Sequence, residues 1–245
     1  ALLDPSGVTM FVVTADNVSF RNLELDGDNP FLGANVPIGP ELTNARNGIV
    51  VDGSAQDGPD NFIADSVRVR RFFRAGIAVD GLADPAVPIE GAAVTNSEFG
   101  VVGGDAASAP AGAALVPNNA RGFTLENCTF DGALESIELR QDNETADTEI
   151  ALCTIANSRR AGVAIRSLSG EARLRLAGNN FDDNAVGVLA AESLGPSNVL
   201  SIEGNTFTGD ETAIRLEEIA GGATAEILGN DVSAGGSGTG FFLQG

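Results

Sequence analysis

Short stretches of alternating apolar and polar residues recur along the chain, and the clearest of them flank a repeated Gly-Asn pair. Phe or Val follows two residues after each Asn, in copies at residues 178–181, 204–207 and 229–232. Around the first copy, Leu174 and Leu176 precede the pair, and Val188 and Ala190 follow it. Period-two alternation over about three to six residues is typical of β-strands, and copies about 25 residues apart predict one structural unit repeated along the chain.

Less regular copies of the same pattern extend the repeat towards the N-terminus. Their apolar positions are Val18, Phe20, Leu25, Ile49 and Val51; Phe62, Val67, Val69, Ile77 and Val79; Val94 and Phe99; Phe123, Leu125, Phe130, Ile137 and Leu139; and Ile150, Ile155, Val163 and Ile165. Strands separated by a full repeat cannot pair as hairpins, but they stack in parallel when the chain winds as a coil. We therefore predict a single all-β domain over residues 1–245, a parallel solenoid of about eight coils that is roughly 40 Å long.

Three phrases carry a resemblance to a known family. They are ADNVSFRNLELDG from Ala15, GNNFDDNAVGVLA from Gly178 and GNTFTGDETAIRL from Gly204. They resemble the repeat of right-handed parallel β-helix proteins of the pectate-lyase-like and periplasmic NosD-type families, and the resemblance covers nearly the whole chain. It implies a single-stranded right-handed parallel β-helix. That superfamily includes polysaccharide lyases, hydrolases, epimerases, phage tailspikes, adhesins and non-catalytic surface domains, so the fold alone does not choose a function.

Two segments interrupt the repeat with Pro, Gly and Ala, at residues 28–47 and 103–119. Loops that leave a regular scaffold are common places for binding and catalytic residues. We expect both insertions to fold over the same side of the rod, and a specific site to lie between these loops and the face that carries Asp52 and Asp80.

One column of the predicted coil is polar. Its members are Cys128, Cys153, Asn179, Asn205 and Asn230, and Phe181 and Phe207 should stack in a neighbouring core column. The Asn residues suit a turn position near the left-handed region, with their amides bonded along the stack, although ligand or metal contact is the functional alternative. The two cysteines should lie about one strand spacing apart, which is compatible with stacked free thiols or with a strained disulfide. A metal site is disfavoured because the chain has no His and no further Cys.

Candidate chemistry begins with Asp52 and Asp80. Each follows the inward pair of its strand, so the two carboxylates should point outward, one above the other. Their repulsion would raise a pKa or recruit a cation such as Ca²⁺, whereas the alternative is a pair of ordinary Asp-Gly turns. The neighbouring acids Asp182 and Asp183 look like the paired carboxylates of glycoside hydrolases, but they fall in a turn phrase.

Arginines form two further candidate surfaces. By the alternation, one outward strip contains Glu138, Arg140, Arg166, Arg215 and Glu217, which suits carboxylated or sulfated sugars or, alternatively, ordinary cross-strand charge pairing. The second surface is the run RVRRFFR, in which Arg70, Arg71 and Arg74 should occupy a turn. This run could contact an anionic ligand, a polysaccharide or an acidic neighbour, and the alternative is a solvated turn that pairs with nearby carboxylates.

Composition narrows the partners. The chain carries 34 Asp and Glu against 14 basic residues, all of them Arg, for a formal charge of −20. The sign of this charge disfavours a nucleic-acid partner. An acidic chain without Lys suggests an extracellular and saline setting, and drift in a high-GC genome explains this composition equally well.

No apolar run is long enough to span a bilayer. The terminal GFFLQG stops on a strand without a polar cap, which suggests a segment of a longer protein or end-to-end or side-by-side assembly.

Catalytic signatures of the resembled enzymes are missing. No motif of the lyases matches, the Gly-His-Gly and Arg-Ile-Lys signatures of the pectin hydrolases are absent, and there is no Trp or Tyr to stack on sugars. We therefore expect a secreted or surface-displayed, non-catalytic structural, adhesive or assembly module that requires no cofactor, with glycan or Ca²⁺ as candidate ligands. The alternative is a lyase, epimerase or hydrolase of acidic polysaccharides that uses Asp52, Asp80 and Arg140.

Overall fold

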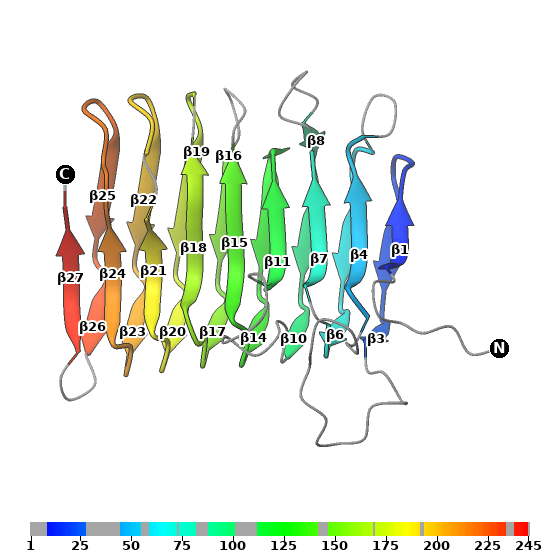
Figure 1. Cartoon of the computed structure of the whole chain (residues 1–245), viewed down its shortest axis with the longest axis horizontal. Helices are drawn as coiled ribbons and strands as arrows, with labels where there is room; N and C mark the ends of the chain where they lie inside the picture. The colour runs from blue at the N-terminus through cyan, green and yellow to red at the C-terminus, as the bar shows by residue number, and fades with distance from the viewer. Residues whose placement is uncertain are drawn as a thin grey trace.

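The chain winds into a parallel β-solenoid, as the repeat predicted (Figure 1). The computed structural model describes residues 9–27, 45–54, 59–72, 74–81, 88–100, 112–141, 147–168, 170–191, 194–233 and 238–244. Within these ranges the regular structure consists of β-strands, and every strand pair is parallel. The described residues form no helix, and hence none that could cross a membrane.

Three sheets run along the axis of the coil. Sheet 1 contains β1 (Thr9–Val13), β4 (Asn47–Asp52), β7 (Ala75–Asp80), β11 (Ala113–Asn118), β15 (Glu135–Gln141), β18 (Ala161–Leu168), β21 (Val186–Ala190), β24 (Thr212–Leu216) and β27 (Thr239–Leu243). Sheet 2 contains β2 (Ser19–Arg21), β5 (Ile63–Asp65), β9 (Ala93–Thr95), β13 (Phe123–Glu126), β16 (Asp147–Ala151), β19 (Arg173–Ala177), β22 (Val199–Glu203) and β25 (Thr224–Leu228). Sheet 3 contains β3 (Glu24–Asp26), β6 (Arg68–Arg70), β10 (Glu98–Gly100), β14 (Thr129–Asp131), β17 (Thr154–Ala156), β20 (Asn180–Asp182), β23 (Thr206–Thr208) and β26 (Asp231–Ser233), and the short strands β8 (Ile89–Glu90) and β12 (Ala120–Arg121) form a separate pair.

Each coil passes from sheet 2 to sheet 3 and then to sheet 1, through two sharp bends. At the first bend one residue has a positive φ, such as Asn127, Leu152 or Gly178, and the next residue points into the coil. The left-handed residue is therefore the Gly that precedes each ladder Asn, for example Gly178 with φ of 64°, and not Asn179 itself. This corrects the prediction that the Asn residues hold the left-handed position, and the reason is that Gly adopts positive φ at lower cost.

The core is a filled column of apolar side chains. The rings of Phe181 and Phe207 stack with centroids 4.6 Å apart and planes 6° apart, as predicted, and Phe99 and Phe130 repeat the same geometry. At the corner where sheet 1 begins, small residues leave room for these rings. A Cβ on Gly187 would lie 2.6 Å from the carbonyl oxygen of Ala213 and 2.8 Å from the Phe207 ring.

The predicted interruptions need one correction. The first, 28–47, falls outside the described residues except for its last three positions, where β4 begins at Asn47. The second, 103–119, was set too long, because residues 113–118 form β11, which pairs with β7 and β15 in sheet 1. Its Pro117 suggested a loop, yet it lies buried in the strand opposite Val79.

The two ends of the stack leave inward side chains uncovered. In β1, Phe11 is 41% exposed, and in β27, Phe241 and Leu243 are 47% and 58% exposed. Among the described residues, β1 pairs only with β4 and β27 only with β24. The exposed apolar residues at the end of β27 agree with the prediction of a strand without a polar cap.

Candidate functional site

The predicted Asn column exists, and the amides of Asn179 and Asn205 use all of their donors in hydrogen bonds. The side-chain oxygen of Asn179 accepts the backbone N–H of Cys153 at 2.9 Å, and its amide group donates to Asn205 and to the carbonyl of Ile150, both at 2.9 Å. Asn205 repeats this pattern with Asn230 one coil further on. These amides satisfy the backbone of the neighbouring coil and have no free donor for a ligand.

Both cysteines are buried free thiols that continue the column. The sulfur of Cys128 accepts the backbone N–H of Ser97 at 3.4 Å, as the Asn oxygens do in later coils. A hydrogen bond between the two thiols, together with burial, raises the pKa of Cys128, and the same hydrogen bond lowers the pKa of Cys153. The stacked arrangement predicted as one alternative is therefore the one observed.

Sequence reasoning missed a second polar column, at the bend between sheets 3 and 1. Its members are Ser158, Asn184 and Asp210, each about 98% buried or more. Asn184 accepts the backbone N–H of Ser158 at 2.9 Å and donates to Asp210 at 2.9 Å. Burial raises the pKa of Asp210 to about 6, and its second oxygen has no hydrogen-bond partner. The available signal was a polar residue five positions after three members of the first column, Cys153, Asn179 and Asn205.

Asp52 and Asp80 lie directly opposite one another on adjacent strands, as predicted. The amide of Asn118 on the next strand donates to Asp80 at 2.7 Å, and Asp52 accepts the backbone N–H of Ser54 at 2.9 Å. Over the described ranges, no group of three or more His, Cys, Asp or Glu residues could hold a metal ion. The Ca²⁺ site at this pair remains a prediction.

A buried charge cluster occupies the outer face of sheet 1 near β15 and β18. Glu135 has no exposed surface and forms ion pairs with Arg166 and, at 3.3 Å, with Arg160. Burial raises the pKa of Glu135, the charge of Arg166 opposes that rise, and the nearby Glu138 reinforces it. Sequence reasoning placed Glu138 and Arg166 on this face but missed Glu135, because strict alternation would point it inward.

Carboxylates engage four of the other predicted arginines, namely Arg140, Arg215, Arg70 and Arg71. Arg140 contacts Glu138 at 2.9 Å, and Arg215 contacts Glu217 at 2.5 Å. Arg71 donates to Asp26 at 2.7 Å. The remaining members of the basic run are Arg70, which pairs with Glu24 and Asp26, and Arg74, which precedes β7.

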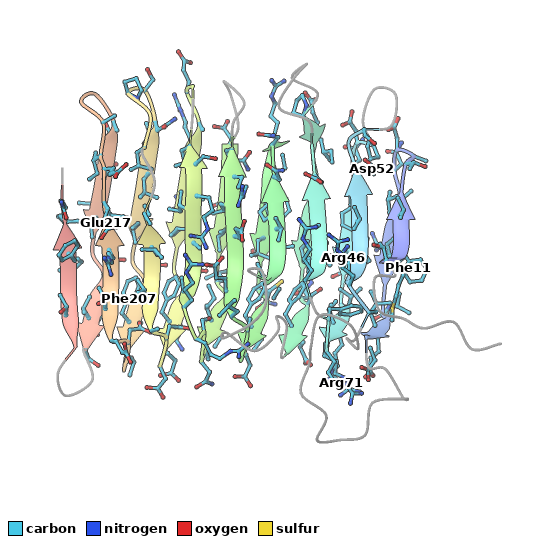
Figure 2. All side chains as sticks on the ribbon, in the orientation of Figure 1. Phe11, Arg46, Asp52, Arg71, Phe207 and Glu217 are labelled. Atoms are coloured by element: carbon cyan, nitrogen blue, oxygen red, sulfur yellow. The ribbon has the colours of Figure 1, made fainter. Side chains whose placement is uncertain are left out.

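Figure 2 shows that the acidic candidate Asp52 and the basic candidate Arg71 lie far apart. Asp52 lies at the end of β4, and Arg71 lies at the opposite edge of the coils. Arg140 is closer to Asp80. Asp80, Asn118 and Arg140 lie opposite one another on the successive strands β7, β11 and β15. Asp182 and Asp183 end β20 and form the following bend, with a positive φ at Asp183, as the turn interpretation predicted.

An accessible groove of about 370 Å³ crosses the outer face of sheet 2. It extends over four successive strands, β13, β16, β19 and β22, and both apolar and charged residues line it. The outward side chains along it include Thr124, Asp147, Glu149, Arg173, Arg175, Val199 and Ser201. Sequence reasoning did not single out this face, because a groove depends on the relative heights of side chains in neighbouring coils.

Comparison with known proteins agrees with the geometry. A family model described as right handed beta helix region matches residues 11–207 and 90–245. No curated protein matches the chain. The two matched ranges span nearly all of the described coils, so the chain belongs to the right-handed β-helix family.

Proposed function

We propose that this chain is a secreted or surface-displayed, non-catalytic β-helical module that acts as a rigid spacer and adhesive element. The observation that supports this function best is the hydrogen bonding between successive coils at both bends. Asn179, Asn205 and Asn230 join successive coils at one bend, and Asn184 and Asp210 do so at the other. All of these side chains except the half-buried Asn230 are buried, so most of the bonds are shielded from water and hold each coil against its neighbour.

Surface charges also join neighbouring coils. Arg68 contacts Glu98 at 2.7 Å, and Arg121 contacts Glu90 at 2.8 Å, in each case across adjacent strands. Exposed pairs of this kind contribute only about 0–1 kcal/mol each. These pairs nevertheless connect neighbouring coils, which suits a rod whose role depends on its shape.

The test combines a binding assay with an activity screen. The purified chain is applied to a panel of immobilised polysaccharides and, separately, incubated with uronate-containing polysaccharides, with and without Ca²⁺. We expect retention on at least one glycan and no product with the absorbance of an unsaturated uronate. An enzymatic product that disappears in Asp80→Asn would overturn the non-catalytic assignment.

A polysaccharide-active enzyme is the second candidate, and the buried Glu135 with its raised pKa favours it. Carboxyl groups with raised pKa values serve as general acids in glycoside hydrolysis, and perturbed pKa values cluster at functional sites. Against this role, Glu135 has no exposed surface with which to reach a substrate. Hydrolysis by the wild type that is lost in Glu135→Gln, with the fold intact by circular dichroism, would favour the enzyme.

A further inference from the structure

Two rows of outward side chains line the groove on sheet 2, and each row keeps the register of the coils. In the first row Asp147 lies opposite Arg173, which lies opposite Val199. In the second row Glu149 lies opposite Arg175. The rows therefore present donors, acceptors and apolar contacts at intervals of one strand spacing.

The first row, unlike the second, has polar groups that are available to a ligand. In the second row, Arg175 is held between Glu149 at 2.5 Å and Glu203 at 3.3 Å. Arg173 and Asp147 are both exposed, and within the described part of the chain neither side chain has a hydrogen-bond or ion-pair partner. A free guanidinium next to a free carboxylate supplies several donors and acceptors about one strand spacing apart.

The charges in the groove indicate what it would accept. Its lining carries two carboxylates, Asp147 and Glu149, and two guanidinium groups, Arg173 and Arg175, so the local charge sums to zero. A polyanion would gain no net attraction in the groove and would be repelled by a chain of charge −20. An uncharged chain rich in hydroxyl groups can use both the donors and the acceptors without this repulsion.

The length of the groove suits a short stretch of an extended polymer. Four strands span three strand spacings, which is about 14 Å at roughly 4.8 Å each. One sugar ring of an extended glycan advances by a similar distance, so the groove accommodates about three sugars in step with the coils. Val199 and the aliphatic stems of the arginines offer apolar surface to the C–H faces of the rings.

We propose that the sheet 2 groove binds an extended, uncharged glycan, with Arg173 and Asp147 as the residues that contact its hydroxyl groups. This proposal rests on the proposed function as an adhesive module and identifies the face and the ligand class. It differs from the outward strip of sheet 1, whose guanidinium groups are occupied by carboxylates.

The test is titration calorimetry with linear hexasaccharides on the whole chain. Cellohexaose, xylohexaose and mannohexaose represent uncharged chains, and hexagalacturonate represents a carboxylated one. We expect at least one uncharged hexasaccharide to bind with little dependence on salt, and its trisaccharide to bind more tightly than its disaccharide. Arg173→Ala should weaken this binding by roughly tenfold or more, since hydrogen bonds to charged groups are among the stronger ones.

Two further variants make the result decisive. Thr124→Trp should block the groove from an outward position of β13, whereas Arg68→Ala, which removes an exposed arginine from sheet 3, should bind as the wild type does. Binding of an uncharged hexasaccharide that survives both Arg173→Ala and Thr124→Trp would exclude the groove but leave the adhesive function standing. Binding of hexagalacturonate alone would refute the ligand class, and failure of every glycan, including the immobilised panel, would refute the adhesive function as well.

Discussion

Replacing Asp210 by Asn tests the second polar column directly. One oxygen of Asp210 accepts the backbone N–H of Asn184 at 2.7 Å and its side-chain amide at 2.9 Å, and the other oxygen has no partner. One coil earlier, the amide of Asn184 donates to the carbonyl of Ile155 at 2.9 Å. By the register of β17, β20 and β23, a donor at position 210 would meet the carbonyl of Phe181. A protonated carboxyl or an Asn amide can supply that donor, whereas a carboxylate cannot.

The magnitude follows from the pKa of Asp210, which burial raises from an ordinary value of 3.8 to about 6. Because the folded pKa is higher than the unfolded one, the contribution of the neutral acid to stability is complete below about pH 4 and is lost as the pH rises through 6. This pKa difference means that ionising Asp210 in the folded state lowers the free energy of unfolding by about 3 kcal/mol at neutral pH. Asp210→Asn removes this cost and keeps the oxygen that accepts from Asn184.

Thermal unfolding of the wild type and Asp210→Asn between pH 4 and 8 measures the effect. For a chain of this size, about 3 kcal/mol corresponds to a rise of about 6–12 °C in Tm, and we expect this rise at pH 7.5 and almost none near pH 4. Asp231→Asn is the matched control, because Asp231 is exposed on β26, and it should leave Tm unchanged. A variant that is no more stable than the wild type at pH 7.5, or equally more stable at both pH values, would refute the reasoning.

Three other substitutions or modifications test separate parts of the fold. Gly187→Ala should destabilise the chain by about 1–3 kcal/mol in urea unfolding, because its Cβ would meet the Ala213 carbonyl and the Phe207 ring, and an unchanged midpoint would contradict that packing. Cys128 and Cys153 should resist Ellman's reagent in the native protein and both react in denaturant, so native labelling of either thiol would contradict their burial. Arg166→Met should lower the free energy of unfolding in urea by about 3 kcal/mol, because it leaves Glu135 with only Arg160. Arg215→Met on the exposed face should lower it by less than about 1 kcal/mol. Equal effects would show that the buried pair contributes no more than the exposed one.

Most of the fold could be predicted from sequence because a solenoid turns a linear pattern directly into contacts. Once the offset of 26 residues is known, the neighbours of Asn179 and Phe181 in the next coil follow as Asn205 and Phe207. The same arithmetic placed Asp52 opposite Asp80 only because the apolar pairs before them defined the register. Parallel stacking requires each strand to match its successor, so an apolar pattern specifies register more strongly here than in an isolated hairpin.

The remaining features depend on bends, where alternation does not apply. Asp210 follows a left-handed Gly, and its side chain points into the coil although the residue is charged. Glu135 lies two residues before the inward Ile137, yet it reaches the outer face because the chain is still turning into sheet 1. An alternation rule assigns faces in the middle of a strand and fails at its first residues and in the bends beside it.

The same limit explains why the groove was not predicted. Arg173 and Arg175 are two residues apart on β19 and point to the same side, so their sequence surroundings appear equivalent. Their difference arises in the adjacent coils, since Arg175 has carboxylates close enough on both sides, and Arg173 lies between Asp147, which does not pair with it, and Val199. Register therefore identifies which residues could pair, but only side-chain geometry shows which guanidinium remains available. That availability distinguishes a candidate binding residue from one that joins two coils.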